Sequence, residues 1–275
     1  MFESHNRSMC MTVNGTSFIR QAAQLVLPKE HGSWSLALEP VALGLCVAPS
    51  VGGGALVMAA VAVFFLRRPL KLGLASKVDP RRPMAVACIS ILSLLALTGL
   101  LLAVKISGAD KLWPLLPAAM AGTIFAWCDS RNVAREGAAE VAGAVTFGIL
   151  PAAFATLAGW SLTAALALAT VSLVRGVPTV LCVRTLLRFN KGQSVTIAPA
   201  VAVAIAGCLV VAWLVWLRFV PWTAAVFALI FAVRTIWLLG WRPRLTPRRV
   251  GIIEAILGTS MVLVLALTWK MAAGN

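Results

Sequence analysis

The stretch LPKEHGSW at residues 27–34 stands immediately before the first long apolar run, and the chain after it is predominantly apolar. A proline, a cation, a carboxylate, an imidazole and a glycine come together here. The glycine permits a tight turn and the serine is suited to cap a following helix. Capping gives no reason for Lys29, Glu30 and His31, so these three are candidate functional side chains. His31 is a candidate proton carrier or pH-sensitive hydrogen-bonding group at the mouth of a membrane bundle.

The composition is that of an integral membrane protein. Hydrophobic residues make up 60% of the 275 residues and charged residues 12%, whereas soluble domains average about 45 to 50% and about 25%. The net charge of +15 fits basic cytoplasmic loops better than nucleic-acid binding, so no nucleic-acid partner is expected. The six cysteines are scattered without a Cys-x-x-Cys pair, which indicates small buried side chains. Neither a metal site nor a cofactor is expected.

Nine apolar segments fit helices that cross a bilayer, which takes roughly 20 mostly apolar residues. The predicted fold class is therefore all-α, a polytopic transmembrane helical bundle of about nine helices. Arg67 and Arg68 interrupt the second segment and shorten it. Residues 1–24 lack the apolar stretch of a signal peptide, so they are predicted to be a disordered cytoplasmic tail before a single transmembrane helical domain at 25–275. The segments are 33–50, 52–67, 84–104, 112–128, 138–158, 161–181, 195–217, 221–240 and 250–270.

Basic residues separate onto two sides of this arrangement. Only Lys105, Lys111, Arg218 and Lys270 fall on the side that contains the minimal loops. By the positive-inside rule, the N-terminus is cytoplasmic and, with an odd number of helices, the C-terminus lies outside. The basic side carries Arg7, Arg20, Lys29, Arg67, Arg68, Lys71, Lys77, Arg81, Arg82, Arg131, Arg135, Arg184, Arg188, Lys191, Arg242, Arg244, Arg248 and Arg249.

Charged side chains inside the predicted helices fall at similar depths. Counting 1.5 Å per residue places three arginines roughly 20 Å below the outer surface of a core about 30 Å thick. Three glutamates lie in the same cytoplasmic third, and a carboxylate left unpaired near the bilayer centre costs about 2.5 to 3.5 kcal/mol. Two outcomes stay open, structural ion pairs that hold the bundle or a polar pocket for a charged ligand. The six residues are Glu39, Arg68, Glu140, Arg175, Arg234 and Glu254.

Further basic residues share helix faces near the same side. Arg184, Arg188 and Lys191 follow i, i+4, i+7 spacing on a predicted continuation of the sixth helix. Each face alone is typical of a solvated or lipid-phosphate-binding surface, but together they form a basic mouth suited to a phosphate or carboxylate. No catalytic residue is assigned. The candidate ligand-binding residues are Lys29, Glu30, His31, Glu39, Arg67, Arg68, Arg131, Glu140, Arg175, Arg184, Arg188, Arg234 and Glu254.

Several motifs resemble the YwiC-like family of bacterial integral membrane proteins. The sharpest is PKEHGSW at residues 28–34, and weaker ones lie at 65–69, 139–140, 183–188 and 249–254. The resemblance covers most of the chain from about residue 25 onward. The resemblance implies a multi-pass protein of the bacterial inner membrane, and it does not indicate which reaction, if any, the protein catalyses.

More remotely, nine helices with polar loops after the second and sixth resemble the UbiA-type intramembrane prenyltransferases. Those enzymes hold magnesium and an isoprenyl diphosphate with Asp-rich motifs on these two loops. This chain departs from that pattern, because residues 67–82 contain one carboxylate, Asp79, and residues 182–193 contain none. Mg²⁺ needs oxygen ligands, so the resemblance implies a UbiA-like fold more than UbiA-like chemistry.

The leading functional hypothesis is a cytoplasm-facing polar and basic cavity that binds an anionic or lipidic ligand. Arginines would bind the ligand, while glutamates and His31 would orient them or move protons. A UbiA-like prenyltransferase is one alternative, and it needs replacement carboxylates such as Asp129, Glu136 and Glu140. A transporter of a small anion and a purely structural subunit are two others. The expected partners are membrane lipids and an anionic or isoprenoid small molecule.

Overall fold

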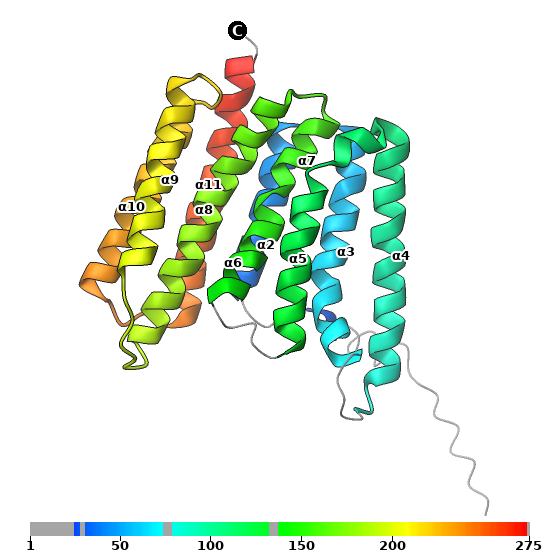
Figure 1. Cartoon of the computed structure of the whole chain (residues 1–275), viewed down its shortest axis with the longest axis horizontal. Coiled ribbons are helices and arrows are strands. Elements are labelled where there is room, and N and C mark those ends of the chain that lie inside the picture. Colours follow the sequence, from blue (N-terminus) through cyan, green and yellow to red (C-terminus); the bar gives the residue numbers. More distant parts are fainter. Residues whose placement is uncertain (1–24, 28–30, 74–78, 132–136, 274–275) are drawn as a thin grey trace, which may run out of the picture.

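Figure 1 shows a computed structural model of the chain, in which helices stand side by side in one bundle. The structure describes residues 25–27, 31–73, 79–131 and 137–273, and none of these residues forms a strand. The predicted all-α bundle is confirmed, while the predicted tail at residues 1–24 lies outside the described residues. The helices are α2 (His31–Val47), α3 (Val51–Gly73), α4 (Arg82–Ser107), the 3-10 helix η1 (Ala109–Leu112), α5 (Leu115–Ser130), α6 (Gly137–Gly148), α7 (Leu150–Leu157), α8 (Leu162–Phe189), α9 (Ala198–Trp216), α10 (Trp222–Trp241) and α11 (Pro247–Ala273).

Length and apolar composition make this a multi-pass membrane protein. Among the described residues, seven helical stretches are long and apolar enough to cross a membrane, and one of them joins α6 and α7 into a single rod at Gly137–Leu157. Helix α2 adds a shorter apolar segment, Trp34–Val47, and α5 has 16 residues. These nine rods correspond to the nine predicted segments. A bilayer core offers the backbone no hydrogen-bond partners, so apolar runs of this length are stable there as helices.

Helix α3 differs from its prediction, because it continues through Arg67 and Arg68 to Gly73. Both cations have protein partners: Arg67 pairs with Asp129 of α5, and Arg68 donates to the carbonyl oxygen of Leu27. A paired charge does not have to leave the membrane, so it need not end the helix. Helix α8 continues past the predicted membrane segment to Phe189, as expected for the continuation that carries Arg184 and Arg188.

Short, tightly packed α7 lies inside the bundle. All eight of its residues are buried, and Phe154 is fully enclosed. Pro151 stands in its first turn, just after the interruption at Ile149 that separates α7 from α6. The ring of Phe154 packs against Gly44 of α2, where a side chain would collide with it. Small residues permit such close approach between membrane helices, where dispersion contacts provide much of the association energy.

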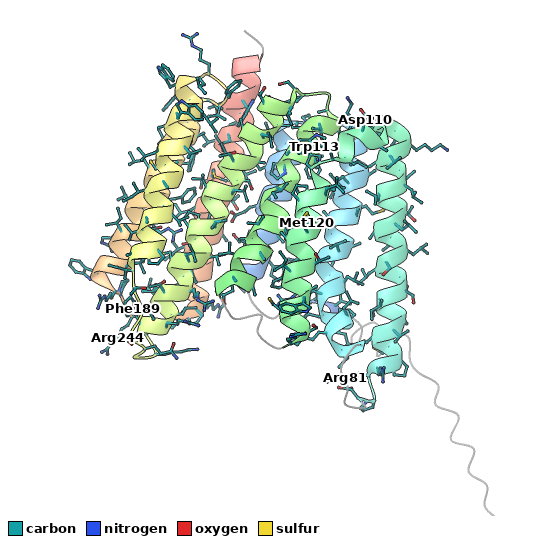
Figure 2. All side chains as sticks on the ribbon, viewed as in Figure 1. Arg81, Asp110, Trp113, Met120, Phe189 and Arg244 are labelled. Atoms are coloured by element: carbon teal, nitrogen blue, oxygen red, sulfur yellow. The ribbon has the colours of Figure 1, made fainter. Side chains whose placement is uncertain are left out.

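The two ends of the bundle differ in charge. Figure 2 shows Arg81 and Arg244 at one end, and Asp110 and Trp113 at the other. We call the first the basic end; α2, α4, α6, α9 and α11 begin there, as Figure 1 shows. The predicted separation of basic residues is thus reproduced among the described residues. The opposite end carries Lys105, Lys111 and Arg218.

Candidate functional site

Four helices bring two arginines and two glutamates together inside the bundle. We call Glu39, Arg175, Thr179, Arg234 and Glu254 the buried charge cluster. Helix α2 supplies the first, α8 the next two, and α10 and α11 one each. Every charged side chain in it is at most 11% exposed. Charges so enclosed are stable only if they meet opposite charges and hydrogen-bonding partners.

Arg175, on α8, contacts three other helices at the centre of the cluster. Its Nη1 lies 3.0 Å from Glu254 Oε2, and its Nη2 donates to the backbone carbonyl oxygen of Glu254 at 2.9 Å. Glu39 lies farther off, and its Oε1 accepts from Arg175 Nη2 at 3.5 Å. Its Oε2 lies 3.4 Å from Arg175 Nε without hydrogen-bond geometry. The guanidinium carbon also stacks 4.6 Å from the ring centre of Phe231 on α10. Arg175 therefore ties α8 to α2, α10 and α11.

Arg234 shares its partners with Arg175. Its Nη2 donates to Glu254 Oε2 and to Thr179 Oγ1, both at 2.9 Å. Arg175 Nη1 donates to the same Thr179 hydroxyl at 2.6 Å, and that hydroxyl donates to the Arg175 carbonyl oxygen at 2.7 Å. One carboxylate oxygen and one hydroxyl thus separate two guanidinium groups. With all four ionisable groups charged, the cluster is neutral.

Four buried polar atoms of the cluster have no hydrogen-bond partner within the described chain. Arg175 Nε is one of them, and it lies 3.4 Å from Glu39 Oε2 in an ionic contact. The others are the donors Nε and Nη1 of Arg234 and the acceptor Oε1 of Glu254. The fully buried thiol of Cys182 adjoins Arg234, but sulfur is a weak acceptor. A buried donor or acceptor without a partner costs about 1 to 3 kcal/mol, and more when the group is charged. The cluster therefore has capacity for further hydrogen bonds.

Two small residues, Ser35 and Gly258, accommodate the Glu39 carboxylate. Glu39 accepts from Ser35, one turn earlier on α2, and its carboxylate lies against Gly258 of α11. A Cβ at Gly258 would coincide with that carboxylate. Gly258 stands one turn after Glu254, and Thr179 one turn after Arg175, so helical spacing places each pair on one face.

Two smaller charged groups lie apart from the cluster. Asp129, which is 6% exposed, accepts from Lys71 Nζ at 3.1 Å and from Arg67 Nε at 3.3 Å. The Arg67 guanidinium also stacks 4.6 Å from the ring centre of Phe125. These contacts join α3 to α5 with one carboxylate and two half-exposed cations.

The third group is a pair between α6 and α8. Arg184 Nη1 lies 3.0 Å from Glu140 Oε2, and Gly137 leaves space beside the guanidinium. The side chains are 16% and 30% exposed, so this pair is more accessible than the buried charge cluster.

The predicted site residues therefore divide among several places. Glu39, Arg175, Arg234 and Glu254 meet in the buried charge cluster. Arg67 and the Arg184–Glu140 pair lie elsewhere, Arg68 contacts Leu27, and Arg131 stacks 4.3 Å from the ring centre of Trp127. Arg188 lies in the last turn of α8, and Lys191 lies past that helix, so the predicted three-residue face is shortened. Lys29 and Glu30 lie outside the described residues, as does the side chain of His31.

Sequence reasoning missed Thr179, Ser35 and Gly258. Helical spacing could have pointed to them, because each stands one helical turn from a charged residue that was already selected. Two of the carboxylates suggested for magnesium are engaged by cations, Asp129 by Arg67 and Lys71 and Glu140 by Arg184. The third, Glu136, lies outside the described residues. Hydrogen bonds from Arg81 lower the pKa of Asp79, in the loop before α4, to about 2. Over the described residues, no three His, Cys, Asp or Glu side chains gather as metal ligands would.

A family model described as YwiC-like protein matches residues 27–155. The resemblance read from the opening stretch is thereby confirmed for α2 to α7. Glu39 lies within the matched range, whereas Arg175, Arg234 and Glu254 lie after it. No curated protein and no solved structure matches the chain. The remote likeness to the UbiA-type fold therefore stays a prediction.

Proposed function

We propose that this multi-pass membrane protein binds an anionic or lipidic ligand at the buried charge cluster, with Arg234 as the group that contacts it. The observation that carries the proposal is the pair of buried Arg234 nitrogens, Nε and Nη1, without an acceptor in the described chain. A network that served only to hold helices together would be expected to satisfy its donors, as buried polar groups do in general. An oxyanion brings the acceptors that Arg234 lacks.

The chemistry of the cluster suits an oxyanion. A guanidinium group matches the geometry of carboxylates and phosphates and remains charged when buried. Hydrogen bonds between ionised groups are roughly twice as strong as neutral ones, and the low dielectric of the interior strengthens them further. Arg175 has a different role, because its contacts to Glu254 and Glu39 hold the two carboxylates in place. Those carboxylates orient the arginines.

Binding of an anionic or lipidic ligand is favoured over magnesium-dependent prenyl transfer. Asp129 and Glu140, which that chemistry would need, are each paired with arginine or lysine. We place the basic end in the cytoplasm of a bacterium, with the N-terminus inside and the C-terminus outside, because basic loops are retained there. The cluster then lies in the cytoplasmic half of the inner membrane.

Native mass spectrometry of the detergent-purified protein tests the proposal. Wild type is expected to carry a small anion or lipid that is lost from Arg234→Gln. Arg81→Gln is the control, because it removes the same charge from an exposed loop residue. Both variants should be monodisperse and should melt cooperatively, which shows that they are folded. Equal occupancy in folded Arg234→Gln and wild type would refute ligand binding at Arg234.

A further inference from the structure

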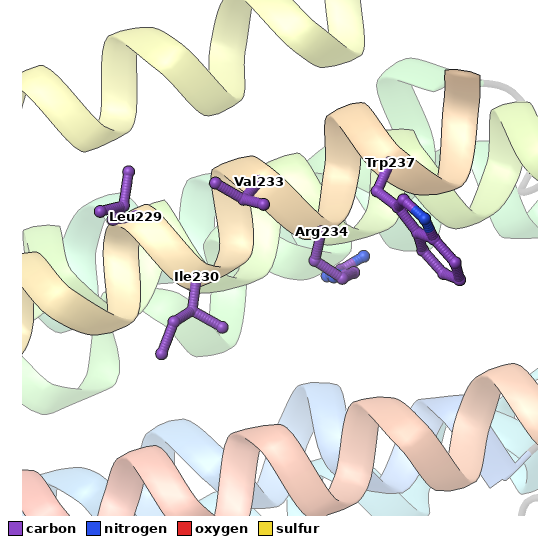
Figure 3. A pocket seen from close by; sticks show the side chains of 5 residues that line it. All are labelled: Leu229, Ile230, Val233, Arg234 and Trp237. Atoms are coloured by element: carbon purple, nitrogen blue, oxygen red, sulfur yellow. The ribbon is translucent and has the colours of Figure 1, made fainter. Parts of the chain in front are cut away.

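Two outward-facing helix surfaces of the bundle differ in polarity. The open face of α10 around Ile230, Val233 and Trp237 presents no polar surface. Figure 3 shows Arg234 on the same helix, but its side chain is only 9% exposed. Lipid tails are as apolar as leucine, so they cover such a face without a specific contact. Helix α3, by contrast, exposes charged groups beside an apolar one.

A single stripe of exposed side chains runs along the second half of α3. Val63, Arg67 and Lys71 are the exposed residues within 55–73, and their spacing of four places them on one helix face. Helix α4 packs along another side of α3. Arg67 and Lys71 both contact Asp129 of α5, so the stripe borders that helix. We call these three residues the α3 stripe.

The α3 stripe has a surplus of one positive charge. Arg67 and Lys71 are 44% and 49% exposed, and they share the Asp129 carboxylate, which is 8% exposed. That carboxylate accepts from Arg67 Nε and from Lys71 Nζ. Within the described residues, neither terminal nitrogen of Arg67 has an acceptor, and Lys71 Nζ has no second one. The guanidinium also stacks on the Phe125 ring, so its free edge is held in a fixed direction.

These free donors lie at the depth of lipid phosphates. At 1.5 Å per residue, Arg67 and Lys71 stand about 24 Å and about 30 Å along α3 from its first residue, in a hydrocarbon core about 30 Å thick. Trp127 of α5 is 56% exposed and marks the same level, because tryptophan is enriched where the core meets the head groups. Val63 lies about 6 Å deeper than Arg67 and offers an apolar contact. The α3 stripe thus matches an amphiphile with its phosphate on the two cations.

The buried carboxylate favours an anionic head group over a zwitterionic one. The cation of a choline or ethanolamine head group would need an anionic partner, but Arg67 and Lys71 cover Asp129. A phosphodiester with a neutral alcohol, as in phosphatidylglycerol, brings one negative charge and balances the surplus. Its free oxygens match a guanidinium edge and accept from an ammonium group. Basic pockets between membrane helices bind anionic head groups in this way.

We infer that the α3 stripe binds an anionic phospholipid, with the phosphate on Arg67 and Lys71 and an acyl chain along Val63. The occupant is a lipid rather than free phosphate, because the cations stand next to an exposed apolar side chain at the edge of the hydrocarbon core. This site is separate from the buried charge cluster and does not depend on the ligand proposed there.

Native mass spectrometry of the full chain in detergent tests the inference by titration with phosphatidylglycerol or phosphatidylcholine of matched acyl chains. Arg67→Gln and Lys71→Gln each remove the surplus charge and leave one cation on Asp129. Arg248→Gln is the control, because it removes the same charge from an exposed residue in the first turn of α11. We expect wild type and the control to bind phosphatidylglycerol about tenfold more tightly than phosphatidylcholine, the factor typical of one hydrogen bond to a charged group. Both α3 variants, if monodisperse and cooperatively melting, should lose this preference.

Several outcomes would overturn the inference. One is equal affinity for the two lipids in wild type, and another is an unchanged preference in folded Arg67→Gln and Lys71→Gln. An equal loss in Arg248→Gln would attribute the preference to the general charge of the basic end. Displacement of the lipid by an equal concentration of inorganic phosphate would make the stripe a free-anion site. Arg234→Gln should keep the preference, and its loss there would move the lipid to the buried charge cluster.

The position of the lipid is tested separately by photochemical cross-linking. Phosphatidylglycerol with a diazirine on an acyl chain should label the peptide that contains Val63 in wild type. This labelling should fall about tenfold in Arg67→Gln, in proportion to the affinity. Labelling confined to other helices would refute a site on α3.

Discussion

Glu254→Gln isolates the electrostatic part of the buried charge cluster, because glutamine keeps the size of the side chain and its capacity for hydrogen bonds. Glu254 Oε2 lies 2.9 Å from Arg234 and 3.0 Å from Arg175. At an effective dielectric constant of about 20, each pair attracts with about 6 kcal/mol before desolvation is counted. Desolvation offsets much of this, and removing one partner of a buried pair typically costs about 3 to 5 kcal/mol. We expect Glu254→Gln to lower the free energy of unfolding by that amount.

The assay is unfolding by sodium dodecyl sulfate in mixed micelles, followed by tryptophan fluorescence. The double variant Glu254→Gln/Arg234→Gln restores charge balance, since it leaves Arg175 with Glu39. Coupled neighbours show interaction energies of about 0.5 to 3 kcal/mol, so the double variant should be more stable than Glu254→Gln alone. A Glu254→Gln protein within about 1 kcal/mol of wild type, or losses that simply add in the double variant, would refute the reasoning.

Two further substitutions probe the surroundings with the same assay. Gly258→Ala places a Cβ on the Glu39 carboxylate and should cost about 1 to 3 kcal/mol through overpacking; Gly54→Ala, which meets no atom within 4 Å, is the control and should not destabilise. If the two alanine variants behave alike, Glu39 does not occupy the space over Gly258. Asp129→Asn should cost only about 1 kcal/mol, because its partners Arg67 and Lys71 are 44% and 49% exposed and solvent screens such pairs. A loss as large as that of Glu254→Gln would show that Asp129 is instead a central structural ion.

The membrane crossings were largely predictable from local composition. Each apolar run became a helix because the bilayer leaves the backbone no alternative. Pro151 stands just after the break between α6 and α7, inside the predicted segment 138–158. The end of α3 was predicted too early, because the partner of Arg67 is Asp129, which lies 62 positions away in the chain. No local rule finds that partner.

The sequence by itself indicated which apolar runs form helices among the described residues and which end of the bundle is basic, and it predicted an approximate depth for each buried charge. Depth follows from counting residues, since a helix advances by a constant rise. Only the tertiary structure decided that Arg175 and Arg234 share Glu254 while Arg184 takes Glu140. The direction in which a side chain points depends on how α2, α8, α10 and α11 pack around one another. Packing depends on contacts between residues far apart in the chain, which the pattern within any one helix does not encode.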